Sequence, residues 1–149
     1  MHPFDIKQAL LAKHAQHVVL IHFPIALCMA GVAFDLAAEW TKNRALAVAA
    51  YYNFTVAAAS VLPVVGTGLL AWQFQLEGQR LKGVLLLHLV LGIFSSLMIG
   101  VIWFVHFRSR RAHEPLLPVY RVPLELLGVA VVTLTAHLGG FLSGVNIPS

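Results

Sequence analysis

The sequence has few charged residues and a single cysteine. Charged side chains make up 11% of its 149 residues and apolar ones 59%, whereas ordinary globular domains are about a quarter charged. So little polar surface cannot cover a water-soluble core, which excludes an ordinary soluble domain. The lone Cys28 excludes an intrachain disulfide, a cysteine-based metal cluster and a Cys-x-x-Cys-His attachment of c-type haem.

The sequence also lacks the common signatures of enzymes. It has no glycine-rich phosphate loop, no His-Glu-x-x-His, and no serine or cysteine nucleophile with an evident base. Its net charge of +4 lies at the ends of apolar runs, which is typical of membrane proteins and gives no reason to expect nucleic acid. The first residues, interrupted by Asp5, Lys13 and His14, do not have the pattern of a cleaved signal peptide. These absences favour a carrier or a subunit over a stand-alone enzyme.

Apolar runs dominate what remains. Four are long enough to cross a bilayer, and we expect spans at about 17–39, 45–72, 83–107 and 119–144. Short connections between them predict an all-α, integral membrane, up-down-up-down four-helix bundle that forms one domain over residues 1–149. The mixed residues 3–14 predict a short helix at the membrane interface.

Basic residues predict the orientation of these spans. Six lie beside the first and third loops and four on the opposite side: Lys42, Arg44, Arg108, Arg110, Arg111 and Arg121 against Lys7, Lys13, Arg80 and Lys82. Loops rich in lysine and arginine stay in the cytoplasm. We therefore expect both termini outside.

Histidines inside the spans are the strongest functional signal, because a polar side chain in hydrocarbon usually has a partner or a role. His22, His88 and His137 lie roughly 8, 9 and 10 Å from the ends of three spans. The alternating topology brings these ends to one side of the membrane. His106 lies about 27 Å beyond His88, near the opposite interface, and is expected to be an ordinary interfacial residue.

Clustered imidazoles are typical ligands of haem iron, copper and zinc. The first and third spans are diagonal in a square bundle, so His22 and His88 form a natural pair, and His137 could pair with either. His17 lies about 140° around the helix from His22 and could serve a second site. Arg80 and Lys82 are placed to pair with haem propionates.

The same residues allow other interpretations. The histidines could bind copper or zinc without porphyrin, or act as polar contacts in a non-catalytic subunit of a larger membrane complex. Acidic residues near the cytoplasmic side are expected to pair with Arg121 or Arg44, with a proton route as the minor alternative: Asp35, Glu39 and Glu125.

Two local patterns predict backbone features of the spans. Pro24 cannot donate a hydrogen bond to the carbonyl of Leu20, and we expect it to loosen the helix beside His22 and to leave that carbonyl for a ligand imidazole. Small residues four apart predict close helix packing and also leave room for a flat ligand: Gly92, Ser96 and Gly100, and Ala136, Gly140 and Gly144.

Residues 17–27, His-Val-Val-Leu-Ile-His-Phe-Pro-Ile-Ala-Leu, resemble the opening of a family of small bacterial four-helix membrane proteins catalogued as a domain of unknown function. Val18 stands where that family usually has proline. Thr67-Gly68-Leu69 with Trp72, and Ala136-His137-Leu138-Gly139-Gly140, are similar to later parts of the family pattern.

This resemblance covers residues 17–144. It implies four spans in the bacterial inner membrane and directs attention to His17, His22, His88 and His137. Members of the family look like candidates for b-type haem binding in electron transfer. Our preferred hypothesis from the histidines is a b-type cytochrome with one haem or two, which would pass electrons from a quinol or a larger redox complex to an outer-face acceptor, as a single chain or an oligomer.

Overall fold

The computed structural model describes residues 13–75, 78, 80–112 and 118–142. Within them the chain forms only helices: α2 (Lys13–Leu20), α3 (His22–Thr41), α4 (Arg44–Gln75), α5 (Gly83–Arg111) and α6 (Arg121–Leu142). Four stretches are long and apolar enough to cross a membrane: Gln16–Thr41, Arg44–Phe74, Gly83–Arg111 and Arg121–Leu142. The predicted all-α, four-span membrane architecture is thereby confirmed. The interfacial helix predicted for 3–14 lies almost entirely outside the described residues.

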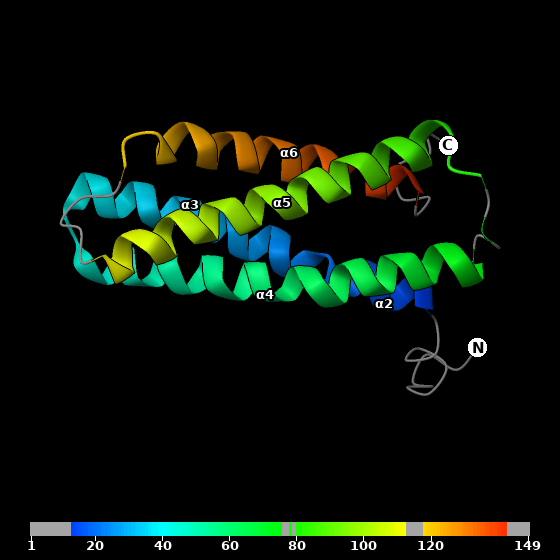
Figure 1. The fold of residues 1–149 in the computed structure, drawn as a ribbon, viewed down its shortest axis with the longest axis horizontal. Coiled ribbons are helices and arrows are strands. Elements are labelled where there is room, and N and C mark those ends of the chain that lie inside the picture. Colours follow the sequence, from blue (N-terminus) through cyan, green and yellow to red (C-terminus); the bar gives the residue numbers. More distant parts are fainter. Residues whose placement is uncertain (1–12, 76–77, 79, 113–117, 143–149) are drawn as a thin grey trace.

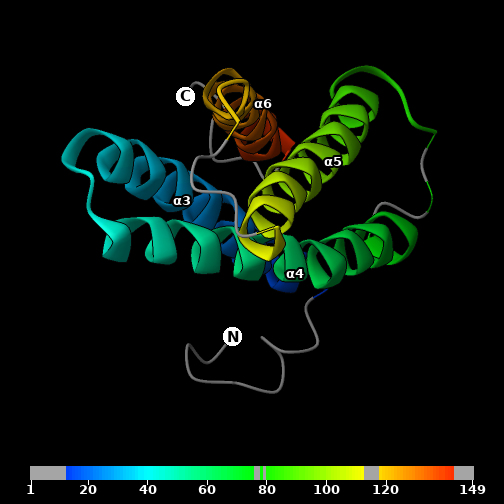
Figure 2. The same cartoon turned by 60° about the vertical axis from the view of Figure 1, so that its left-hand side comes forward.

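The helices pack in the cyclic order expected of an antiparallel bundle. α3 lies against α4, α4 against α5, α5 against α6, and α6 against α3. In Figure 1, α2 continues the line of α3 at the end of the bundle where α5 begins and α6 ends. Figures 1 and 2 show α4 and α5 diverging toward the loop that joins them. α4 and α5 therefore lie closest to each other near the start of α4 and the end of α5.

A break at Ile21 separates α2 from α3. Pro24 has no N–H for the carbonyl of Leu20, and the neighbouring bond from the N–H of Ile25 to the carbonyl of Ile21 is long, at 3.5 Å. The helix is thus loosened beside His22, as predicted. The His22 imidazole, however, donates from Nδ1–H to the carbonyl of Val18 (2.7 Å) and not to that of Leu20.

Two glycines bring the helices together in the core. A Cβ at Gly31 would lie 2.6 Å from the ring of Phe54 on α4, and one at Gly128 would lie 2.6 Å from Ile102 on α5. By contrast, no described side chain comes within 4 Å of a Cβ placed at Gly92 or Gly100. The predicted packing role of these two glycines within the chain is therefore wrong. The second row ends at Gly144, outside the described residues.

Candidate functional site

Four ionisable side chains are buried together inside the bundle. Asp35 comes from α3, His106 from α5, and Arg121 and Glu125 from α6, and their exposed fractions are 1%, 4%, 6% and 0%. Arg121 and Glu125 are one helical turn apart, so both face the same neighbours. We call these four residues the inner polar centre. Charged side chains inside a membrane span are rare and typical of functional positions.

Arg121 connects this centre to the membrane interface. Its Nε donates to Oδ2 of Asp35 (2.8 Å), and its Nη2 donates to Oε2 of Glu39 (2.7 Å). Glu39 is half exposed and also accepts a hydrogen bond from Nζ of Lys42 at 2.9 Å. The predicted pairing with Arg121 is thereby confirmed for Asp35 and Glu39, but it is wrong for Glu125, whose carboxylate is hydrogen-bonded to His106.

His106 and Glu125 form the second half of the inner polar centre. Nε2 of His106 lies 2.8 Å from Oε1 of Glu125. The other carboxylate oxygen, Oε2, is buried without a hydrogen-bond partner among the described residues. The ring of Phe54 packs on the imidazole with its centroid 4.7 Å away. Our expectation of an ordinary interfacial His106 is therefore wrong, because α6 supplies a buried acid at its level.

The inner polar centre also contains potential metal ligands. One ligand atom from each of Asp35, His106 and Glu125 lies within 4.8 Å of the others, and this is the single such group in the part of the chain described. Ligand atoms around a tetrahedral zinc lie about 3.4 Å apart, given bonds of about 2.1 Å. The ligand atoms of the three side chains would therefore have to move closer together to bind an ion. Asp35 is also already paired with the guanidinium of Arg121.

His88 contacts its neighbouring helix at the opposite end of the bundle. Its Nδ1–H donates to the carbonyl of Thr135 on α6 (3.2 Å), and the hydroxyl of Thr135 is hydrogen-bonded to that of Ser95 (2.7 Å). Gly139 lies so close that an added Cβ would stand 3.2 Å from the imidazole. α6 thus fixes the ring with the proton on Nδ1, so that Nε2 is the nitrogen that carries the lone pair.

His17 is held in a similar way by α4. Its Nδ1 lies 3.2 Å from the carbonyl of Val64 and 3.3 Å from the hydroxyl of Thr67. A Cβ at Gly68 would come within 2.9 Å of the ring. Thr67 and Gly68, which the sequence pattern includes, are therefore the residues of α4 that contact the imidazole of His17.

His22 and His137 are exposed on the helix surfaces. His22 precedes the buried Gly31 by nine residues, and His137 follows the buried Gly128 by nine. Nine residues correspond to about 180° around a helix, so both histidines face away from the interior. Depth in the membrane span alone favours His22 over His17 as a ligand. The position of His17 around its helix, however, turns its side chain toward α4, whereas His22 is exposed. Arg80 and Lys82 are exposed just before α5.

His17 and His88 lie at the same level of the bundle. His88 precedes His106 by 18 residues, which is five turns and about 27 Å along α5. His17 also precedes Asp35 by 18 residues, on the line that α2 and α3 form across the break at Ile21. Asp35 and His106 meet in the inner polar centre, and their helices run in the same direction. We call the half of the bundle that holds His17 and His88 the outer half.

Comparisons with known proteins point to one family. Neither the curated proteins nor the solved structures contain a match to this chain. The DUF2231 family of predicted membrane proteins matches residues 13–145, which include all five helices. The chain therefore belongs to the DUF2231 family of predicted membrane proteins.

Proposed function

We propose that this protein is a b-type cytochrome-like electron-transfer protein of the membrane, with haem b bound between His17 and His88 in the outer half. The observation that carries the proposal is the hydrogen bond from Nδ1–H of His88 to the carbonyl of Thr135. Such a bond fixes the tautomer and the ring orientation of a metal-bound histidine, and it makes the ligating nitrogen more basic.

The residues around the two histidines fit this role. Both imidazoles are half-buried, and each lies against a glycine of the next helix, Gly68 or Gly139. Their similar level in the outer half would let the two imidazoles hold one haem, which would supply redox chemistry there. Arg80 and Lys82 would pair with the propionates at the membrane surface. A second haem would have to use the outward-facing His22 and His137.

The bound haem would supply the one-electron chemistry of the protein. The side chains would set its potential, through the hydrogen bond from Nδ1–H of His88 to the Thr135 carbonyl and through exclusion of water by the apolar helix faces. We infer a membrane donor such as a quinol or a larger redox complex, and an acceptor at the outer face.

The orientation belongs to the same proposal. At the opposite end from the histidines, the guanidinium of Arg110 lies 4.6 Å from the ring centroid of Tyr51, and that of Arg111 lies 5.3 Å from that of Phe107. Arginine and aromatic residues together anchor helix ends at the membrane interface. We infer that this end faces the cytoplasm of a bacterial inner membrane, with both termini outside.

An absorption spectrum of protein purified with a haem supply tests the proposal. We expect the reduced-minus-oxidised bands of a low-spin b-type haem. His17→Ala and His88→Ala should lose them, while the matched outward-facing variants His22→Ala and His137→Ala should keep them. A wild-type protein without haem would overturn the proposal, and loss of haem in His22→Ala alone would overturn the pairing.

The two other interpretations of the histidines are distinguished on the same samples. If elemental analysis finds stoichiometric copper or zinc without porphyrin, and His88→Ala loses this metal, the histidines form a metal site without haem. A protein that holds neither, and whose histidine variants change assembly alone, would be a non-catalytic subunit.

A further inference from the structure

The charges of the inner polar centre do not cancel unless it binds one positive charge. Asp35 and Arg121 neutralise each other at 2.8 Å. Glu39 shares Arg121, but it is half exposed and pairs with Lys42 beside the solvent. With a neutral His106, the carboxylate of Glu125 would leave one uncompensated negative charge in a fully buried place. An isolated buried charge is costly, and such groups usually become neutral.

The hydrogen bonds of Glu125 indicate where the charge is compensated. Oε2 is buried without a partner among the described residues, while Oε1 lies 2.8 Å from Nε2 of His106. A bare carboxylate oxygen suffers more from a missing partner than the carbonyl oxygen of a neutral acid. A proton on Oε1 would therefore make Glu125 the donor and the neutral His106 the acceptor.

We propose that Glu125 and His106 form a proton-binding site inside the membrane, in which Glu125 carries an exchangeable proton at neutral pH and donates it to Nε2 of His106. The proposal stands on the inner polar centre alone and is independent of haem in the outer half. A divalent cation fits the centre less well, because it would bring two positive charges beside the guanidinium of Arg121.

The groups that surround the pair set its proton affinity. α3 contributes Asp35, the more distant Glu39 and the buried thiol of Cys28. α4 contributes the apolar ring of Phe54, and α6 contributes Arg121. The guanidinium of Arg121 lies 2.8 Å from Asp35 as its counter-ion, so gain or loss of one proton at Glu125 or His106 changes the net charge of the inner polar centre.

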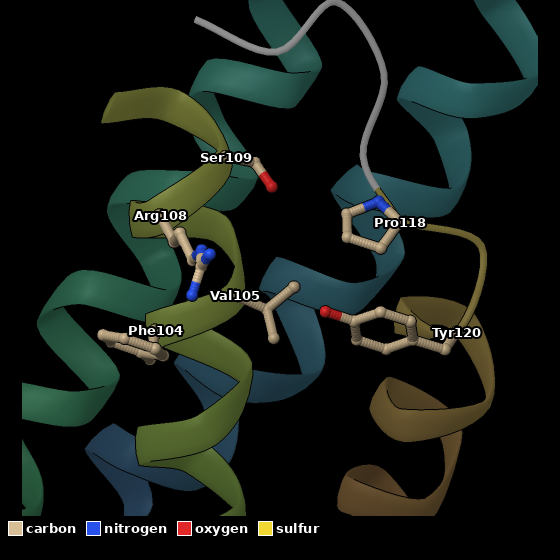
Figure 3. A pocket seen from close by; sticks show the side chains of 6 residues that line it. All are labelled: Phe104, Val105, Arg108, Ser109, Pro118 and Tyr120. Atoms are coloured by element: carbon tan, nitrogen blue, oxygen red, sulfur yellow. The ribbon is translucent and has the colours of Figure 1, made fainter. Parts of the chain in front are cut away.

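A cavity lies between the pair and the end of the bundle in chain order, and we infer that protons enter from it. It has a volume of about 390 Å³ and lies between α5 and the start of α6. Figure 3 shows the guanidinium of Arg108 and the hydroxyls of Ser109 and Tyr120 around this space. Ser109 follows His106 by three residues on α5, and Tyr120 precedes Arg121. Water in the cavity would bring protons to Ser109, which lies about one helical turn beyond His106 on α5.

Infrared spectroscopy of the protein in lipid bilayers tests the proposal. We expect the carbonyl stretch of a protonated carboxylic acid at neutral pH, which shifts in D₂O and on ¹³C-labelling of glutamate. Glu125→Gln should remove this band, and the matched half-exposed Glu39→Gln should retain it. His106→Phe should shift the band upward, because the acid loses its acceptor.

A second variant covers the case in which Glu125→Gln does not fold. The triple variant Glu39→Gln, Glu77→Gln, Glu114→Gln retains Glu125 as its only glutamate, and its ¹³C-glutamate band should match that of the wild-type protein. Absence of the acid band at neutral pH would overturn the proposal, whether an imidazolium or one bound metal ion per chain takes the place of the proton.

Discussion

Removal of the Arg121 side-chain charge should destabilise the bundle more than any surface substitution. Arg121→Met leaves the Asp35 carboxylate, which is 1% exposed, without its counter-ion. Breaking a buried ion pair in this way costs about 3–5 kcal/mol in the free energy of unfolding. The double variant Asp35→Asn, Arg121→Met has no unpaired charge and should therefore be more stable than Arg121→Met alone.

Reversible unfolding in mixed micelles, followed by far-UV circular dichroism, measures these differences. The control is Lys42→Met, which breaks an ion pair whose side chains are 78% and 53% exposed and should cost less than about 1 kcal/mol. A loss below 1 kcal/mol in Arg121→Met, or a double variant whose loss equals the sum of the two single losses, would refute the reasoning.

Three further predictions concern the helix contacts in the core, the contact between Gly139 and His88, and the buried cysteine. Gly31→Ala places a methyl group 2.6 Å from the ring of Phe54 and should cost about 1–3 kcal/mol on unfolding, whereas Gly92→Ala faces open space and should be neutral or stabilising. Gly139→Ala crowds the ring of His88 at 3.2 Å and should lower haem content in absorption spectra, with Gly100→Ala unchanged. Cys28 is fully buried, so maleimide should label it only after unfolding, and rapid labelling of the folded protein would contradict this packing.

The sequence was sufficient for the fold because length and hydropathy define membrane spans. It was not sufficient to predict which face of each helix lies toward the interior of the bundle. In a membrane both the core and the lipid-facing side chains are apolar, so the hydrophobic pattern does not distinguish them. Depth in the span therefore favours His22 as a ligand, although its position around the helix turns it away from the interior.

A usable signal for the interior face was present in the polar residues. Asp35 and His106 must avoid lipid, and each lies 18 residues from a histidine on the same helix face, His17 or His88. The bond between His106 and Glu125 follows from α6 bringing its acid to the level of His106. That contact depends on the packing of α5 against α6, which no local pattern specifies.

The glycines illustrate the same limit. The spacing of Gly92 and Gly100 matches a common packing motif, yet the closest contacts occur at Gly31 and Gly128, which stand outside such a row. A glycine permits two helices to approach only at the point where they cross, and the crossing point depends on the whole bundle.

Ligation of haem by His17 and His88 is the central claim, and electron paramagnetic resonance of the oxidised protein tests it most directly. We predict the low-spin ferric signal of two imidazole ligands in the wild-type protein and in His22→Ala and His137→Ala. Replacement of either His17 or His88 by alanine should convert this signal to high-spin iron or abolish it. A bis-imidazole signal that survives in both of those variants, or a haem-free wild-type protein, would contradict the account.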